Sequence, residues 1–332
     1  MTPEFTPLPL PAPLWMITLL HVVTLTLHFA AMNFVVGGIV TILFGKFNDR
    51  WNNPTVKRVI KLLPAAMAFT ITFGVAPLLF TQLIYHGPVY AASIVGAWFW
   101  IMIVAAAIIG YYLLYAASFR GLSSGRSGIF LSLALLALVY VSFVYSNVFS
   151  LSENPDLIKT VYLEDQSGMS LNPDVTSWIF RWFHMLLGAV TVGGFIVGYI
   201  GRNDDEGYQA GKMFFLYGMI AASLFGLLYL MTLADQMKAF MRSAAVWWLT
   251  ASLVLSAGSL HFYFKKRFAA AGAMLLVSLL GMVVIRHEVR LLRLGESFNP
   301  ARLPVEPQWG AIALFAISFV LAVALLWYML SR

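Results

Sequence analysis

The stretch FAAAGAMLLVSLLGMVVI, residues 268–285, decides the class of fold. It is a continuous run of apolar and small residues without a charge, and it does not alternate between polar and apolar positions. An uncharged run of about 18 residues or more is long enough to cross most of a hydrocarbon core about 30 Å thick as an α-helix. The stretch therefore predicts a transmembrane helix.

Comparable runs recur along the whole chain. The 332 residues are 61% hydrophobic and 11% charged, whereas an ordinary globular domain carries roughly a quarter charged residues to cover its surface. Transmembrane barrels are excluded because their strands are short and alternate in polarity. We predict an all-α polytopic membrane protein with about nine transmembrane helices, at residues 13–45, 60–85, 91–118, 128–150, 176–200, 210–234, 243–264, 267–290 and 308–330.

Two of these spans share a pattern that indicates an internal repeat. His28 is followed nine residues later by a Gly-Gly pair that begins at Gly37, and His184 is followed at the same distance by the pair that begins at Gly193. A glycine, a basic residue and an Asn-Asp pair then follow in both stretches. Self-similarity of this kind predicts repeated structural units. We expect two parallel four-helix repeats plus one helix, divided as residues 1–150 (first repeat), 151–175 (extracytoplasmic loop), 176–290 (second repeat) and 291–332 (linker and ninth helix).

The distribution of charge predicts an orientation. If the N-terminus lies outside, the inner loops hold 13 of the 21 basic residues and four of the 14 acidic ones. Basic residues concentrate in cytoplasmic loops. We therefore expect a multi-pass protein of the bacterial inner membrane with a periplasmic N-terminus and a cytoplasmic C-terminus. The N-terminal stretch lacks a basic region, so a cleaved signal peptide is not expected.

The chain contains no cysteine. This excludes disulfides, thiolate-bound iron–sulfur clusters and covalently attached c-type haem. A redox cofactor would have to be held without a covalent bond, and histidine is the residue best suited to hold it. The net charge of +7 is explained by the inner loops, so a nucleic-acid partner is not implied.

Five of the six histidines fall at the predicted outer side. Histidine within a span is costly and usually faces the interior of the bundle, and neutral imidazole is a common axial ligand of haem iron. We therefore predict one or two b-type haems. His21 and His28 lie seven residues apart on one helix and cannot ligate the same iron, so each needs a partner from another helix. The predicted iron ligands are His21, His28, His184 and His287, whereas His86 and His261 are read as interfacial residues.

Arginines at the outer ends of the spans depart from the usual charge rule. Guanidinium groups suit carboxylates, so Arg181, Arg242 and Arg286 are expected to hold haem propionates, with interfacial snorkelling toward lipid headgroups as the alternative. Gln82, Tyr85 and Asp235 are expected at the same level. A hydrogen-bonding group beside a proton acceptor is what quinol oxidation requires, and these three residues are the predicted catalytic group.

Three short stretches carry a resemblance to known families. They are FGVAPLLFTQLIY (residues 73–85), RWFH (181–184) and IRHEVR (285–290). The first and third resemble membrane subunits found beside multihaem c-type cytochromes, and the second is similar to the membrane part of cytochrome-linked urate oxidases. More distantly, the chain resembles subunit I of cytochrome bd quinol oxidases, although the quinol loop of that family is missing.

The resemblance implies a haem b-containing subunit that oxidises the reduced form of a membrane quinone, such as menaquinone. It would pass electrons to a c-type cytochrome on the outer face, as part of a quinol:cytochrome c oxidoreductase complex. Three alternatives remain open at this point: a secondary transporter with two parallel repeats, a bd-like terminal oxidase subunit, and a haem-handling protein. The last class lacks its Trp-Trp-Asp signature here, because Trp247-Trp248 is followed by Leu249.

Overall fold

The computed structural model describes residues 9–120 and 126–331. Parts of the predicted first and last segments, residues 1–8, 121–125 and 332, lie outside this description. Within the described residues nine helices are long and apolar enough to cross a membrane, which confirms the predicted all-α polytopic fold. They are α1 (Leu14–Phe44), α2 (Pro54–Ile84), α4 (Ala97–Arg120), α5 (Arg126–Leu151), α7 (Val175–Ile200), α8 (Asp205–Met231), α10 (Ala245–Phe264), α11 (Phe268–Leu294) and α12 (Trp309–Leu330).

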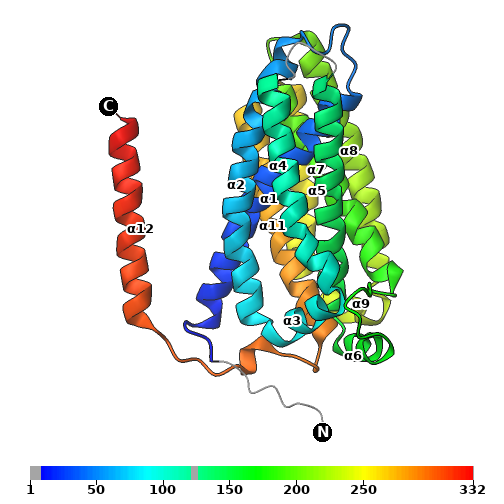
Figure 1. The fold of residues 1–332 in the computed structure, drawn as a ribbon, viewed down its shortest axis with the longest axis vertical. Coiled ribbons are helices and arrows are strands. Elements are labelled where there is room, and N and C mark those ends of the chain that lie inside the picture. Colours follow the sequence, from blue (N-terminus) through cyan, green and yellow to red (C-terminus); the bar gives the residue numbers. More distant parts are fainter. Residues whose placement is uncertain (1–8, 121–125, 332) are drawn as a thin grey trace.

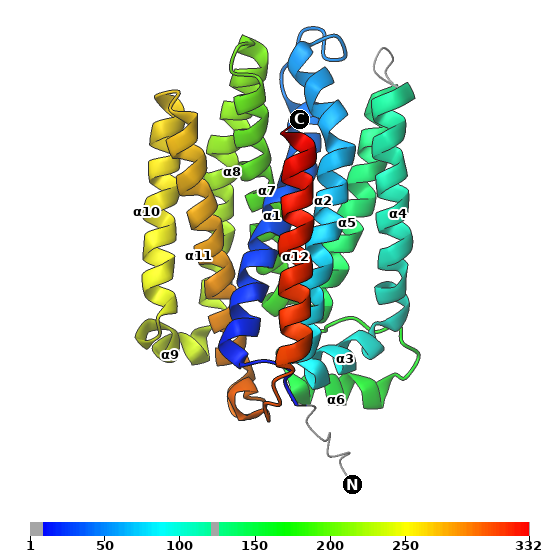
Figure 2. The same cartoon turned by 90° about the vertical axis from the view of Figure 1, so that its left-hand side faces the viewer.

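The remaining helical segments are short and lie together at one end of the bundle (Figures 1 and 2). The predicted span at residues 91–118 is divided at Gly96 into a short α3 and the long α4. The stretch expected to be a loop between the repeats contains α6, because Asn154 caps the helix by accepting from Leu157 N and Pro155 suits the first turn. The short elements are α3 (His86–Val95), α6 (Pro155–Glu164), η1 (Ala234–Gln236), α9 (Met237–Arg242) and η2 (Pro300–Arg302).

The helices pack as two corresponding sets around the central pair α1 and α7. Helix α2 packs on α1 and α8 packs on α7, while α4 pairs with α5 and α10 pairs with α11. Helix α5 contacts both central helices, α1 and α7, to the same extent, and α11 contacts α1 more extensively than α7. The pairs α1–α2 and α7–α8, and α4–α5 and α10–α11, therefore occupy corresponding places in the two sets.

Glycines let the central helices approach each other closely. A side chain on Gly37 would overlap the backbone of Ala189, and its Cβ would lie 2.9 Å from the Cα of Gly193. A side chain on Gly193 would in turn overlap the backbone of Gly37. Small residues at such crossings allow membrane helices to pack by close backbone contact. The first glycine of each pair, Gly37 and Gly193, thus forms the crossing of α1 and α7.

Helix α12 stands apart from the bundle (Figures 1 and 2). The linker from α11 is held just before α12 begins, where Leu10 N donates to Pro304 O at 2.8 Å and Glu306 N donates to Leu10 O at 2.9 Å. The N-terminal segment and the linker to α12 are therefore joined at the end of the bundle that also carries α3, α6 and α9.

Candidate functional site

Two histidines occupy corresponding positions in the two sets of helices. The Nδ1 atom of His28 on α1 lies 2.9 Å from the carbonyl oxygen of Thr70 on α2. The Nδ1 atom of His184 on α7 lies 2.8 Å from the carbonyl oxygen of Ala222 on α8. A carbonyl oxygen can only accept a hydrogen bond, so Nδ1 donates in both. The neutral imidazole then presents the bare lone pair of Nε2, which is the atom available to ligate a metal.

A glycine on the neighbouring helix makes room for each of these rings. A Cβ atom on Gly74 would lie 2.8 Å from Nδ1 of His28, and a Cβ atom on Gly226 would lie 2.8 Å from Nδ1 of His184. In both sets the glycine follows the carbonyl acceptor by four residues, one helical turn. The two environments therefore match in the ring, the acceptor and the glycine.

The two rings face away from each other. Each histidine precedes by nine residues the glycine at which α1 and α7 cross. Nine residues are two and a half helical turns, which puts the histidine on the opposite side of its helix from that glycine. His28 accordingly packs toward α2 and His184 toward α8. His28 and His184 thus occupy corresponding positions and face different neighbours, so each would need another partner to complete the ligation of an iron.

A cavity of about 300 Å³ lies beside His184, among α7, α8, α10, α11 and part of α1. Along α11 the lining begins at Leu275 and ends at Val289, fourteen positions later, which corresponds to about 21 Å along the helix. Most of the lining is apolar, and the polar or charged residues are few. Those that bear on its chemistry are Arg181, His184, Ser223, Tyr229 and Arg286.

Arg286 reaches into this cavity without an acidic partner. Its Nη1 atom donates to the Met185 sulfur at 3.1 Å, and its guanidinium carbon lies 5.8 Å from the centre of the Phe29 ring. Among the described residues no carboxylate lies within ion-pair distance of Arg286. A thioether is a weak acceptor, and a buried cation is costly without an anion. The cavity wall is therefore suited to an anionic group.

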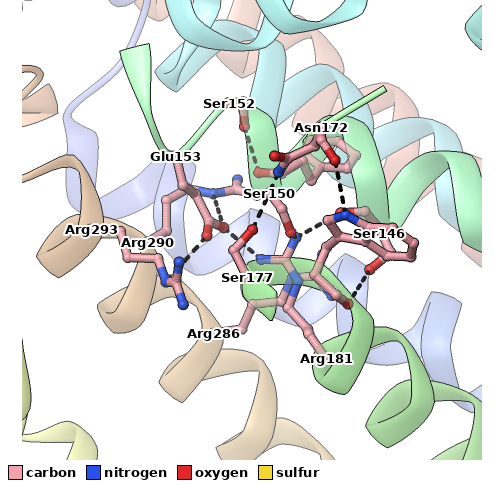
Figure 3. A network of polar contacts seen from close by, with 12 residues as sticks. Ser146, Ser150, Ser152, Glu153, Asn172, Ser177, Arg181, Arg286, Arg290 and Arg293 are labelled. Atoms are coloured by element: carbon pink, nitrogen blue, oxygen red, sulfur yellow. Dashed lines mark hydrogen bonds and ion pairs between the residues drawn. The ribbon is translucent and has the colours of Figure 1, made fainter. Parts of the chain in front are cut away.

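Three other arginines, Arg181, Arg290 and Arg293, converge on Glu153 (Figure 3). The Glu153 carboxylate lies 2.8 Å from Arg181 Nη1, 3.6 Å from Arg290 Nε and 3.8 Å from Arg293 Nε. Arg181 Nη2 also donates to Ser150 Oγ at 2.5 Å and to Ser146 O at 3.0 Å. Burial alone would raise the pKa of Glu153, but Arg181, Arg290 and Arg293 outweigh it and hold that pKa below its ordinary value.

This cluster carries more positive than negative charge. One carboxylate faces three arginines, and the Nε atoms of Arg181, Arg290 and Arg293 are buried without a hydrogen-bond partner. Arg181, predicted to hold a propionate, instead donates from its Nη1 atom to Glu153. Arg286 is the arginine of the predicted group that remains available to a ligand in the cavity.

His21 and His287 lie on the neighbouring helices α1 and α11. Nδ1 of His21 lies 3.2 Å from the carbonyl oxygen of Pro77, and Nδ1 of His287 lies 3.3 Å from the Tyr85 hydroxyl. Burial raises the pKa of Tyr85 to about 12, although Arg290, 5.1 Å from the ring centre, opposes the shift. Tyr85 thus keeps its proton at neutral pH.

The structure does not gather the rest of the predicted site. Asp235 on η1 and Arg242 on α9 are exposed, and Gln82 is half-buried. No hydrogen bond or ion pair among the described residues joins Gln82, Tyr85 and Asp235 to one another. An acid that acts electrostatically on Tyr85, more strongly than Glu288 does, is Glu153, which has no role in the sequence prediction. The signal available for Glu153 was the concentration of polar residues among residues 146–153, at the end of an otherwise apolar span.

No three His, Asp or Glu side chains come together as a site for a bare metal ion within residues 9–120 and 126–331. Haem iron takes at most two axial side chains, so the haem expectation is untouched by that finding. Comparison with family models, with curated proteins and with solved structures found no match to this chain.

Proposed function

We propose that this protein is a haem b-bearing electron-transfer subunit of a bacterial cytoplasmic membrane. In this proposal it oxidises a quinol of the membrane pool and passes the electrons to a c-type cytochrome at the outer face. The observation that carries the proposal is His184, whose Nδ1 atom is fixed on the Ala222 carbonyl at 2.8 Å beside an apolar cavity with an unpaired arginine.

The residues of the cavity fit the chemistry of haem in three respects. The lining is mostly apolar, as a porphyrin ring requires. His184 supplies an imidazole whose Nδ1–H is held by an outer acceptor, the arrangement that orients metal-binding histidines and increases their basicity. Arg286 supplies a cation with no carboxylate partner among the described residues, which suits a propionate.

When bound, haem would supply a one-electron centre between a two-electron donor and a one-electron acceptor. The chain's own residues would hold that centre and set its surroundings. His184 would ligate iron, Arg286 would hold a propionate, and Gly226 would leave room for the ring of His184. His28, with Gly74 and the Thr70 carbonyl, offers a corresponding ligand in the first set of helices for a second haem.

The outer-face direction rests on the predicted topology together with the position of these groups. His21, Arg181, Arg286 and His287 all belong to the halves of their helices nearest the end that carries α3, α6 and α9. The positive-inside distribution of charge makes that end periplasmic. A haem near this surface would lie on the side of an extracytoplasmic cytochrome.

The proposal is tested by purifying the protein in detergent and recording reduced-minus-oxidised visible spectra, with a chemical haem assay alongside. We expect the bands of a b-type haem, and we expect them to form on addition of a quinol as well as of dithionite. Absence of haem by both methods, even after the apoprotein is incubated with hemin, would end the proposal.

A further inference from the structure

Helix α8 presents one stripe of apolar side chains to the surroundings of the bundle. Ile220, Leu224, Leu227 and Met231 are all exposed and follow one another at intervals of four, three and four residues, which places them on one helix face. Leu227 differs from the others because it also lines the cavity beside His184. It is 50% exposed, so the cavity reaches the lipid-facing surface at this residue.

Helix α10 shows the same property on the facing side. Leu253 is 48% exposed and also lines the cavity. Its neighbour Val254 is exposed but does not line it. Ser223, one turn before Leu227 on α8, is exposed and lines the cavity as well. Three residues on two helices therefore border both the cavity and the outer surface.

The packing of the helices agrees with an opening at this place. Helix α8 packs less extensively on α10 than its counterpart α2 packs on α4. Between α8 and α10 the cavity is thus closed by few helix–helix contacts, and not by a closely packed pair of helices. The opening lies close to the predicted iron ligand, because Leu227 follows Gly226, the residue that abuts the His184 ring.

We propose that Ser223, Leu227 and Leu253 frame a lateral opening between α8 and α10, through which a bilayer-dissolved hydroquinone reaches the cavity. The frame is two leucines and one hydroxyl and faces the hydrocarbon region, so it admits an apolar molecule from the membrane and excludes a charged solute from water. Inside, the Ser223 hydroxyl offers a hydrogen bond to the oxygen-bearing ring of the hydroquinone, next to the haem that His184 and Arg286 would hold, while the tail of the hydroquinone stays in lipid. The opening rests on the proposed function, for which it supplies the path of the electron donor.

The opening is tested by narrowing it with the double variant Leu227→Trp/Leu253→Trp. The matched control is Leu224→Trp/Val254→Trp, which adds the same side chains to the same two helices at exposed positions that do not line the cavity. Proteins are placed in lipid nanodiscs. We expect decylubiquinol to reduce the haem of the first variant about tenfold more slowly than that of wild type, the effect of a barrier raised by about 1.4 kcal/mol. Rates are expressed per haem bound, because Leu227 and Leu253 line the cavity. Dithionite reduction of both variants and quinol reduction of the control variant should match wild type.

A second measurement does not depend on haem. Quenching of heptylhydroxyquinoline N-oxide fluorescence reports binding of a quinol analogue to the protein with or without cofactor. We expect its association to slow in the narrowed variant and not in the control.

If the analogue associates with both variants as fast as with wild type, the proposed opening is wrong even where haem is present. If wild type contains no haem but the narrowed variant alone slows association, the proposed function fails and the opening stands. Competition by added phospholipid that abolishes binding would identify a lipid as the occupant and overturn the hydroquinone.

Discussion

The Nδ1 atom of His184 and the carbonyl oxygen of Ala222 lie 2.8 Å apart, which fixes both the tautomer and the direction of the imidazole. The acceptor belongs to α8 and the ring to α7, so the packing of these two helices sets the position of Nε2. Metal-binding histidines depend on such outer partners for orientation and affinity. His28 and Thr70 repeat the relationship in the other set of helices at 2.9 Å.

The space next to the ring gives a first prediction. A Cβ on Gly226 would lie 2.8 Å from Nδ1 of His184, so Gly226→Ala should displace the ring and weaken haem binding about tenfold, the loss typical of a disturbed outer partner. Hemin titration of the apoprotein measures the change. Gly310→Ala on α12, where nothing lies within 4 Å, should bind haem like wild type. An unaltered haem affinity in Gly226→Ala would show that the His184 ring does not ligate the iron.

Arg286 gives a second prediction through its charge. A cation near iron favours the more negative, reduced centre, so Arg286→Leu should lower the midpoint potential by about 60 mV, the one-electron equivalent of a tenfold change. Arg286→Lys keeps the charge and should retain most of the potential. Potentiometric titration of the visible spectrum measures both. The matched control is Arg242→Leu, because Arg242 is exposed on α9. Equal potentials for Arg286→Leu and Arg242→Leu would remove Arg286 from the haem environment.

The crossing of α1 and α7 gives a third prediction, on stability. A side chain at Gly193 would overlap the backbone of Gly37, and overpacking of this kind costs about 3 kcal/mol. Gly193→Ala should therefore unfold at a lower denaturant concentration in detergent, as followed by circular dichroism. Gly87→Ala, with nothing within 4 Å, should change stability by no more than about 0.5 kcal/mol. Equal stability of the two variants would mean that α1 and α7 do not cross at these glycines.

Glu153 gives a fourth prediction, on pH. Its pKa in the folded protein lies below the ordinary value of 4.5 because three arginines outweigh the effect of burial. A depressed pKa stabilises the folded state above the unfolded-state value, and this stabilisation is lost as the pH falls through the folded-state pKa. Unfolding midpoints measured from pH 7 downward should therefore decline in the acid range below about 4.5.

The variant Glu153→Gln isolates this contribution. It leaves Arg181, Arg290 and Arg293 without their carboxylate, and breaking a buried ion pair in this way costs about 3 kcal/mol. The variant should be less stable than wild type at neutral pH, and the difference should shrink in acid. Glu164→Gln, at an exposed position on α6, should follow the wild-type profile. A difference that stays constant with pH would contradict the assigned ionisation of Glu153.

The nine spans and the correspondence of His28 with His184 could be predicted from the sequence, because hydropathy and fixed spacing are local properties. The partners of the histidines could not. The Thr70 and Ala222 carbonyls are backbone atoms of helices with no distinguishing residue at those positions, and their role follows from how α2 and α8 pack.

The charged cluster was beyond sequence reasoning for a similar reason. Glu153 follows α5 of the first set of helices, whereas Arg181, 28 residues later, lies on α7 and Arg290 lies on α11, both in the second set. Asp235, by contrast, is an acid at the expected level of the membrane but lies exposed on η1. The depth of a residue in the membrane can be read from the sequence. The direction in which its side chain points, into the bundle or away from it, depends on tertiary packing.

The central claim is tested most directly by the haem content of His184→Ala. It is compared with wild type and with His261→Ala, a variant near the C-terminal end of α10. Haem per protein is determined after purification and again after incubation with hemin. The account predicts b-type haem in wild type and in His261→Ala, and loss of the haem of the cavity in His184→Ala after both treatments. Full haem content in His184→Ala, or none in wild type, would contradict it.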